Sequence, residues 1–568
     1  MKHLSLPNDS LRNVLLLSAV FCTLCSLPVH AESDVDEAPL LMLRFSKEHS
    51  DTEEHWANML SILRQYPECC DEVWFSTGTT VPPLEVHAAH VEMMKRGKAD
   101  LQRLGIGTSV QVQMTIGHGD SSHTPAGWEA KTWTGWTGST GVEARYCNCP
   151  RQPEFLNYIR AMARLYAEVH PRTVWIDDDL RYDNHYPATR DSRLGCWCAT
   201  CLKAFSDEEH RMWTRETLDQ AMASDPQLAA RWKAFSIESL RCIAEIIAQE
   251  TKAVSPETRM GYQKTFWDED STVVRVILQT LARVSGQRVD YRPGGSAYYD
   301  RKHPAEQIVK SMDAARFMRV MGCPDYVATW CPEVESWPRH YGSRTAQSVL
   351  LEAFTGLAYG MNAVSMYVTD RWEETPELQA RSMIGPVADG ADVLRRYAHA
   401  NRATEAVGFR CDGDDNHPLY EFGTLGIPVL PGMGRSLGTL TRDELSPVNI
   451  YGEPSSAVQR VRQQMDERAP SPVLCLSPYV GLLIPRVLAD GTLRTVGLLN
   501  GRIDTQGPIR LCLRSLPSEV RKVTWRELRR KPVKLRVERD EHGEAYVSVP
   551  SIGAWNAGFL EIGTVSRK

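Results

Sequence analysis

The sequence has little of several features that would point to common functions. After residue 31 it has no apolar run long enough to span a bilayer, and it has no internal repeat or low-complexity linker. Its formal charge is only -6, which argues against a nucleic-acid partner because phosphate binding requires a basic surface. Gly432 and Gly434 lack the strand-turn-helix context of a dinucleotide site, so this pair indicates a turn.

The one long apolar run lies at the N-terminus. Lys2 and Arg12 precede the run 14–27, and Val29-His30-Ala31 then fits the small-x-small pattern that signal peptidase recognises. We therefore expect residues 1–31 to be a signal peptide. The protein is then expected to be secreted or periplasmic.

Apolar strand-like runs alternate with amphipathic helical segments over residues 32–400. The chain of 568 residues exceeds one core, so we expect more than one domain. Eight strand-helix repeats predict a (β/α)8 TIM barrel with insertions, and a doubly wound open sheet is the alternative. The expected strands are 41–45, 73–75, 110–116, 174–176, 260–263, 289–292, 326–330 and 364–368, and the expected helices are 52–66, 85–104, 152–169, 205–253, 268–284, 304–320, 343–360 and 376–400.

The pattern changes after residue 400. Residues 401–478 mix short segments and a helical stretch at 456–468, which predicts a small α/β or linker module. From residue 479 to 568, short alternating runs are separated by Gly, Asp, Asn and Pro, which is typical of a C-terminal β-sandwich.

Two groups of carboxylates follow strands of the expected barrel. Asp177, Asp178 and Asp179 end the fourth strand, and Glu333 and Glu335 follow the seventh. Active sites of this fold lie at the carboxyl ends of the strands. Two facing carboxyl groups are what glycoside hydrolysis requires, one to protonate the leaving oxygen and one to attack the anomeric carbon or activate water. The alternative for the aspartates is a solvated loop that caps a helix.

Cysteines form a second pattern, Cys196-x-Cys198-x-x-Cys201. Fifteen cysteines less Cys22 and Cys25 of the expected signal peptide leave thirteen, an odd number, so at least one is unpaired or metal-bound within a monomer. In an oxidising compartment, disulfide formation is the alternative to metal binding.

These residues resemble family 42 β-galactosidases of glycoside hydrolase clan A, as a local match only. That family has an Ile-Asp-Asn-Glu strand end followed by Cys-x-Cys-x-x-Cys, similar to Ile176-Asp177-Asp178-Asp179 and the cysteines at 196–201, and a further cysteine similar to Cys149. The resemblance implies Asp179 as acid/base and Glu333 as nucleophile, with Glu335 the alternative nucleophile. It also implies a (β/α)8 barrel and a homo-oligomer.

The sequence departs from the family at two positions. Asp179 stands where the family has Glu, and Asp178 stands where it has Asn. The proton donor is then one methylene shorter, and two adjacent acids should raise one pKa through repulsion and burial. A shorter donor also leaves an inverting geometry open.

The resemblance also implies a metal site. Cys149, Cys196, Cys198 and Cys201 match the ligand order of a structural zinc site that some family members carry, and thiolates in a tetrahedral array suit Zn²⁺. The expected zinc is structural, and no cofactor is expected for catalysis.

Further residues near the expected barrel mouth are candidates for binding sugar. Fifteen tryptophans are notable, because sugars stack on aromatic rings, although loops also pack their own aromatics. Strand-end position favours function for the charged candidates. The predicted substrate-binding residues are Asp177, Arg181, Asn184, His185, Trp133, Trp136, Arg292, Trp337, Arg339, Asp370 and Trp372.

The sequence therefore predicts an exported glycoside hydrolase that acts on a terminal sugar of an oligosaccharide or glycoconjugate. Altered acids and abundant arginines keep a sialidase or an N-acetylhexosaminidase-type enzyme as alternatives. The replacement of Glu by Asp179 also motivates a carbohydrate-binding barrel without catalysis. A metal-dependent hydrolase that uses the three aspartates is the last alternative, since no histidine pair accompanies them.

Overall fold

The computed structural model describes most of the chain after the expected signal peptide. No helix in this part is both long and apolar enough to cross a membrane. The predicted signal peptide lies outside the described residues and stays a prediction. The described residues are 40–119, 126–182, 192–266, 271–295, 297–300, 305–340, 342–369, 374–413, 416–445 and 455–563.

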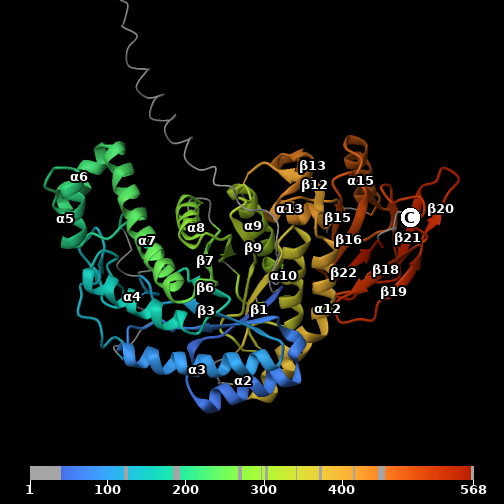
Figure 1. Cartoon of the computed structure of the whole chain (residues 1–568). Helices are drawn as coiled ribbons and strands as arrows, with labels where there is room; N and C mark the ends of the chain where they lie inside the picture. The colour runs from blue at the N-terminus through green and yellow to red at the C-terminus, as the bar shows by residue number, and fades with distance from the viewer. Residues whose placement is uncertain are drawn as a thin grey trace, which may run out of the picture. The chain divides into compact units, whose positions relative to one another are not determined.

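A curled sheet of nine strands, all paired in parallel, forms the centre of the first 400 residues (Figure 1). Its strand order is β10-β11-β1-β2-β3-β6-β7-β8-β9. All eight predicted strands are confirmed, and β10 is an additional short strand that follows β9 after two residues. The bounds are β1 Leu41–Arg44, β2 Glu72–Ser76, β3 Gly107–Val112, β6 Thr173–Ile176, β7 Arg259–Thr265, β8 Val289–Gly294, β9 Val327–Trp330, β10 Glu333–Glu335 and β11 Val364–Tyr367.

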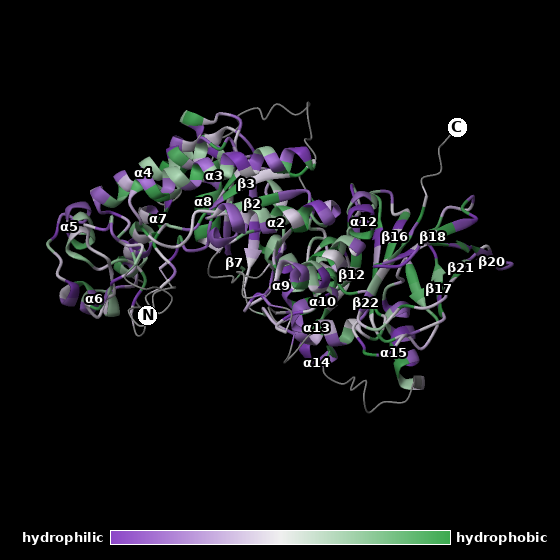
Figure 2. Ribbon diagram, turned by 90° about the horizontal axis from the view of Figure 1, so that it is seen from below, coloured by the Kyte–Doolittle hydropathy of each residue, from purple (hydrophilic) through white to green (hydrophobic). Residues whose placement is uncertain are grey.

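Helices alternate with these strands, as predicted. The segment 205–253 differs from the prediction, because it divides into three helices where Thr214 and Asp225 cap new N-termini with their side chains. In Figure 2, helices such as α4 show both hydrophilic and hydrophobic residues, as expected for elements with one buried face. The bounds are α2 Glu53–Gln65, α3 Leu84–Arg103, α4 Pro153–Ala167, α5 Ala199–Glu208, α6 Arg215–Ser224, α7 Pro226–Val254, α8 Ser271–Ser285, α9 Glu306–Met321, α10 Ala346–Ala358, α11 Pro376–Gln379 and α12 Gly385–Ala400.

Alternate residues of the strands meet on the concave face of the sheet. Trp74 of β2 stacks on Trp175 of β6 with ring centroids 4.1 Å apart, in a buried cluster with Met42, Cys331 and Ala363. Gly261 of β7 makes room for this layer, because a Cβ there would lie 2.5 Å from the Trp175 ring. Side chains two residues further along each strand therefore project beyond this packed layer, at the carboxyl ends of the strands.

Two further sheets follow residue 400. A seven-stranded sheet has the order β13-β12-β15-β16-β22-β18-β19, and a four-stranded sheet has the order β14-β17-β21-β20. The bounds are β12 Glu405–Cys411, β13 Gly434–Leu440, β14 Val473–Cys475, β15 Leu482–Val487, β16 Leu493–Asn500, β17 Ile509–Leu513, β18 Lys522–Glu527, β19 Val533–Arg536, β20 Glu538–Arg539, β21 Ala545–Val549 and β22 Asn556–Glu561.

These two sheets share one apolar core. Leu498 and Trp525 of the larger sheet belong to the same buried cluster as Leu511 and Val547 of the smaller sheet. Strands β12 and β13, which precede the predicted boundary at residue 478, hydrogen-bond into the larger sheet, and β14 pairs with β17. The sheets therefore extend across that boundary, and the division into a module and a sandwich stays a prediction.

Candidate active site

The carboxyl end of the curled sheet carries buried charged side chains from several strands. Arg44 ends β1, Asp177 follows β6, Arg292 lies in β8 and Glu333 begins β10. Arg44 approaches Glu333 Oε1 to 3.2 Å with Nη1 and Asp177 Oδ1 to 3.9 Å with Nη2. Arg292 approaches the same two oxygens to 2.7 Å and 3.9 Å. The two acidic groups predicted to face each other are thus brought together by the same two arginines.

Glu333 accepts hydrogen bonds at both of its side-chain oxygens. Its Oε2 accepts hydrogen bonds from the backbone N of Gly295 at 2.9 Å and from the Tyr298 hydroxyl at 3.4 Å. Burial alone would raise its pKa, but the positive charges of Arg292 and Arg44 contribute to lowering it to about 2. Glu333 is therefore a carboxylate at neutral pH.

Glu335 lies two residues further along β10, and its pKa is shifted in the opposite direction from that of Glu333. Its oxygens lie 3.7 Å from Arg44 Nη1 and 3.9 Å from Arg339 Nη1, and its side chain is 16% exposed. Burial and the negative charge of Glu333 raise its pKa to about 7. Glu335 therefore titrates near neutral pH.

Two of the aspartates after β6, Asp177 and Asp178, also have pKa values that are shifted in opposite directions. Asp177 Oδ1 accepts a hydrogen bond from Gln111 Nε2 at 2.7 Å, and burial with the charges of Asp178 and Asp179 raises its pKa to about 7. Burial would also raise the pKa of Asp178, but Arg181, whose Nη1 lies 3.1 Å from Asp178 Oδ2, contributes to holding it well below its ordinary value.

Asp179 is the most deeply buried of the three. Its side chain is 0% exposed, and its Oδ1 lies 2.8 Å from Nδ1 of His118, whose side chain is 47% exposed. The charge of Asp179 and the hydrogen bond to it raise the pKa of His118 to about 9, against the opposing effect of burial. The acid/base position of the family resemblance thus holds an aspartate joined to an exposed imidazolium.

The tryptophans predicted to stack on sugar lie in different environments. Trp133 is buried, donates from Nε1 to Asn148 Oδ1 at 2.8 Å and packs on the rings of Phe155 and Tyr158. Trp136 is 1% exposed. Their burial does not support a stacking role, and packing on α4 accounts for the Trp133 ring.

Among the predicted aromatics that the structure describes, Trp337 is the accessible one. It is 50% exposed, and the guanidinium of Arg339 lies 4.6 Å from its ring. Arg339 also lies 4.3 Å from the ring of Tyr367 at the end of β11. These contacts join Trp337 to the same group of charges as Glu335.

Four predicted substrate-binding residues lie outside the described part of the chain. They are Asn184, His185, Asp370 and Trp372. Their assignment stays a prediction, whereas Arg181 and Arg292 contact the acids directly.

The four predicted metal ligands come together in a buried cluster. The Sγ atoms of Cys149, Cys196, Cys198 and Cys201 all lie within 4.8 Å of one another, and Cys149 Sγ is 3.4 Å from those of Cys198 and Cys201. Four sulfurs about 2.3 Å from one zinc would lie roughly 3.8 Å apart, whereas a disulfide is about 2.05 Å long. The donor set and its spacing fit Zn²⁺, and Cys149 would be joined through it to the N-terminus of α5.

The sequence did not identify several residues that complete the site. Arg44, Gln111 and Gln263 lie on predicted strands at positions that alternate with outward-facing apolar residues, so the period of two could have identified them. Gln263 accepts from Arg292 Nε at 3.0 Å and fixes that guanidinium. His118 lies in a loop after β3, where no periodic signal exists.

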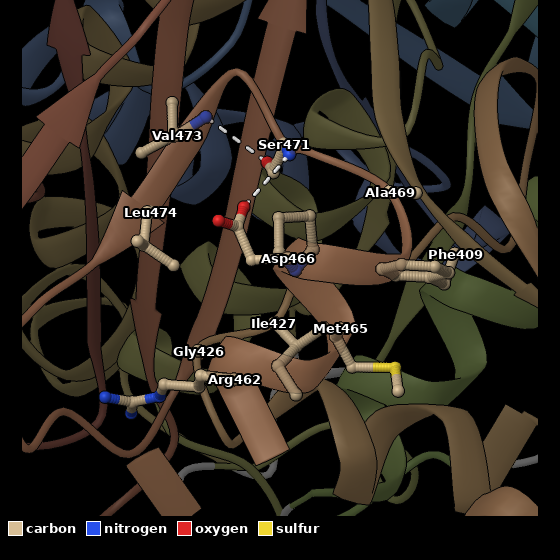
Figure 3. Close-up of a pocket in the computed structure, with 11 residues that line it drawn as sticks. Phe409, Gly426, Ile427, Arg462, Met465, Asp466, Ala469, Ser471, Val473 and Leu474 are labelled. Carbon is tan, nitrogen blue, oxygen red and sulfur yellow. Dashed lines mark hydrogen bonds between the residues drawn. The ribbon is translucent and has the colours of Figure 1, made fainter. Parts of the chain in front are cut away.

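A small pocket elsewhere in the chain lacks comparable chemistry. It lies between β12, β14 and the helix α15 Ser455–Arg468, and Phe409, Ile427 and Met465 line it (Figure 3). Of its polar residues, Asp466 accepts from the backbone N of Ser471, as Figure 3 shows. This pocket has no group positioned for bond cleavage.

Comparison with known proteins gives structural likeness only. No family model and no curated protein matches the sequence. An alpha-L-fucosidase from Paenibacillus thiaminolyticus has a TM-score of 0.55 at 9% identity, over 93% of this chain and 100% of that one. A beta-galactosidase from Rahnella sp. R3 has a TM-score of 0.55 at 12% identity, over 93% and 98% of the two chains. A catalytic mutant of a GH42 beta-galactosidase from G. stearothermophilus has a TM-score of 0.56 at 10% identity, over 92% and 98%. At these identities the likeness establishes a shared fold, and these solved glycosidases have it.

Proposed function

We propose that this protein is a glycoside hydrolase in which Glu333 is the nucleophile and Asp179 occupies the acid/base position. The observation that carries this proposal is the bridging of Asp177 and Glu333 by Arg44 and Arg292, which holds two acidic groups close together at the carboxyl end of the sheet. The fold shared with solved glycosidases supports it.

The proposed reaction needs one nucleophile and one proton donor. A carboxylate oxygen of Glu333 attacks the anomeric carbon as the glycosidic C–O bond breaks, and the β6 side delivers a proton to the leaving oxygen. Water then cleaves the glycosyl ester and returns a proton to the β6 side. NMR of the first-formed sugar tests this order, because retention of configuration supports it and inversion would make Glu333 a base instead.

The choice of Glu333 over Glu335 rests on the contacts that orient Glu333. Its two oxygens accept hydrogen bonds from Arg44, from the backbone N of Gly295 and from the Tyr298 hydroxyl, and Oε1 lies 2.7 Å from Arg292 Nη1. The direction of its pKa shift agrees, because the nearby cations lower the pKa of Glu333 and a nucleophile must be ionised.

The substrate is a terminal sugar of an oligosaccharide or glycoconjugate. The resemblance supports a β-galactoside, and two of the solved structures that share the fold are beta-galactosidases. A panel of aryl glycosides that includes galactosides, N-acetylhexosaminides and sialosides tests the function and selects among these sugars. Turnover that is lost in both Asp179→Asn and Glu333→Gln supports an enzyme. Sugar binding without turnover on any linkage would favour a carbohydrate-binding barrel, and loss of turnover in EDTA would favour a metal-dependent hydrolase.

We also propose that the curled sheet closes into an eight-stranded barrel. Strands β9 and β10 are consecutive pieces of one extended segment, with β9 paired to β8 and β10 paired to β11. The Trp330 carbonyl accepts hydrogen bonds from the backbone N of Asn362 at 3.1 Å and of Ala363 at 3.3 Å. These bonds support a continuous ring in which that segment is the seventh strand.

A structural zinc on Cys149, Cys196, Cys198 and Cys201 is proposed from the spacing of their sulfurs. When bound, zinc would hold Cys149 and the N-terminal turn of α5 together, at a distance from bond cleavage. Metal analysis of protein purified without chelator should find about one zinc per chain. A stoichiometry near zero with no reactive thiols would mean disulfides instead.

Export through the N-terminal segment and assembly into a homo-oligomer are further proposals. N-terminal sequencing of protein from an expressing cell tests cleavage near residue 31. Light scattering of the purified protein tests assembly, and a mass of one chain would contradict it.

A further inference from the structure

Asp179 lies where the proton donor is expected, yet its side chain is 0% exposed. A carboxyl group must lie within hydrogen-bond reach of the glycosidic oxygen to protonate it. His118 lies between this carboxyl group and solvent, because Asp179 Oδ1 bonds to Nδ1 of an imidazole that is 47% exposed. The two nitrogens of imidazole lie on different edges of the ring, so Nε2 points away from Asp179.

His118 lies at the same end of the sheet as the acids. It follows β3, which pairs with β6, and Gln111 of β3 bonds to Asp177. Both flanking glycines have positive φ, +126° at Gly117 and +111° at Gly119, which L side chains rarely adopt. These two glycines therefore set the backbone conformation on both sides of His118.

We propose that His118 is the residue that transfers the proton and that Asp179 is a positioning residue acting through it. This inference rests on the proposed glycoside hydrolase function and refines its acid/base side. The imidazolium Nε2–H protonates the leaving oxygen as Glu333 attacks, which leaves neutral imidazole hydrogen-bonded to the Asp179 carboxylate. In the second step the imidazole takes a proton from the attacking water, which restores the starting state.

The length of the side chains agrees with this division of roles. The family that the sequence resembles has Glu at this position, and Asp179 is one methylene shorter. An imidazole hydrogen-bonded to the shorter carboxylate carries the proton beyond the carboxyl group itself. Among the described residues, Asp179, Asp178 and Asp177 are charged groups that raise the pKa of the ring, which favours a protonated imidazole at neutral pH.

The leaving group provides the test. The best aryl glycoside is prepared with 2,4-dinitrophenol, which leaves without protonation, and with phenol, which requires it. His118→Gln should lower kcat/KM on the phenyl glycoside by about 10²- to 10⁴-fold and should lower it far less on the dinitrophenyl glycoside. Asp179→Asn should show the same contrast, whereas Glu333→Gln should lose both substrates.

The pH profile is a second readout that a purely structural role would not move. The alkaline limb of kcat/KM for the phenyl glycoside should lie near pH 9 in the wild type and move toward about 6.5 in Asp179→Asn, because the imidazolium loses its carboxylate partner. Two results would overturn the inference. One is a fall in kcat/KM in His118→Gln that is equal for the phenyl and dinitrophenyl glycosides. The other is a small fall in His118→Gln together with a large fall in Asp179→Asn. If the wild type cleaves no glycoside in the panel, the proposed function itself fails. If it cleaves them with dependence on Glu333 but not on His118, only this inference fails.

Discussion

The acidic group that follows β6 and the acidic group in β10 show the same pattern of pKa shifts, but they differ in the groups that can donate a proton. Each group pairs an acid held ionised by arginine, Asp178 or Glu333, with one whose pKa is raised to about 7, Asp177 or Glu335. Within the described residues, the β6 side adds an exposed imidazolium, His118, that has no counterpart at β10. Similar carboxylates therefore have different partners on the two strands, and the proposed mechanism assigns attack to β10 and proton transfer to β6.

The largest expected effect separates the two acids of β10. Glu333→Gln should lower kcat/KM on the best aryl glycoside by roughly 10⁴- to 10⁶-fold, because the glycosyl ester can no longer form. Glu335→Gln is the matched control, two residues along the same strand, and should retain far more activity. A greater loss in Glu335→Gln would reverse the assignment within β10.

Removing one bridging arginine should disturb both acidic groups. Arg292→Met leaves the buried carboxylates of Glu333 and Asp177 short of a partner, so the free energy of unfolding should fall by about 3–5 kcal/mol. The pKa of Glu333 should rise without this cation, so the acidic limb of kcat/KM should move to higher pH. Urea unfolding and a pH-rate profile measure the two effects.

Arg283→Met is the control for the bridging arginine, because Arg283 is 61% exposed and pairs with Glu245 at the surface. It should change the free energy of unfolding by less than about 1 kcal/mol. If the two variants unfold alike, Arg292 does not hold the acidic groups together.

The contributions of Glu333 and Glu335 to the free energy of unfolding change with pH in opposite directions. The folded pKa of Glu335, about 7, exceeds its unfolded value, so its contribution is complete below about pH 4.5 and is lost as the pH rises through 7. The contribution of Glu333 is instead lost as the pH falls toward 2. Glu335→Gln should therefore reduce the loss of stability between pH 5 and 8 by at most roughly 3 kcal/mol.

Thermal unfolding at several pH values measures the change due to Glu335. Glu541→Gln, at a side chain that is 87% exposed, is the control and should leave the slope of Tm against pH as in the wild type. A slope in Glu335→Gln equal to that of the wild type would remove the coupling between the two acids of β10.

The smallest expected effect compares an exposed tryptophan with a buried one. Trp337→Ala should raise KM by about 3- to 10-fold with little change in Tm, since stacking contributes roughly 0.5–1.5 kcal/mol. Trp133→Ala should instead lower Tm, because its ring packs on Phe155 and Tyr158. The KM values and unfolding curves of both variants check this, and an unchanged KM in Trp337→Ala would remove it from the sugar site.

The sequence identified the strands and their terminal acids because both have local signatures. Asp177 to Asp179 end an apolar run, and Glu333 and Glu335 follow another, so alternation and position were sufficient. The bridging role of Arg44 depends on contacts across the sheet with residues 133 and 289 positions away, which no local pattern contains. The loop position of Trp133 predicts a binding role, but no local sequence pattern shows that its ring is buried against α4. His118 was missed because its partner, Asp179, lies 61 residues further along the chain.

A crystal structure of Glu333→Gln with a bound oligosaccharide shows whether both acidic groups act on one sugar. We expect the anomeric carbon within about 3–3.5 Å of the Gln side chain at position 333, with the glycosidic oxygen facing His118. A sugar that contacts only one of the two acidic groups, or that binds away from both, would contradict the claim that β6 and β10 act on one bond.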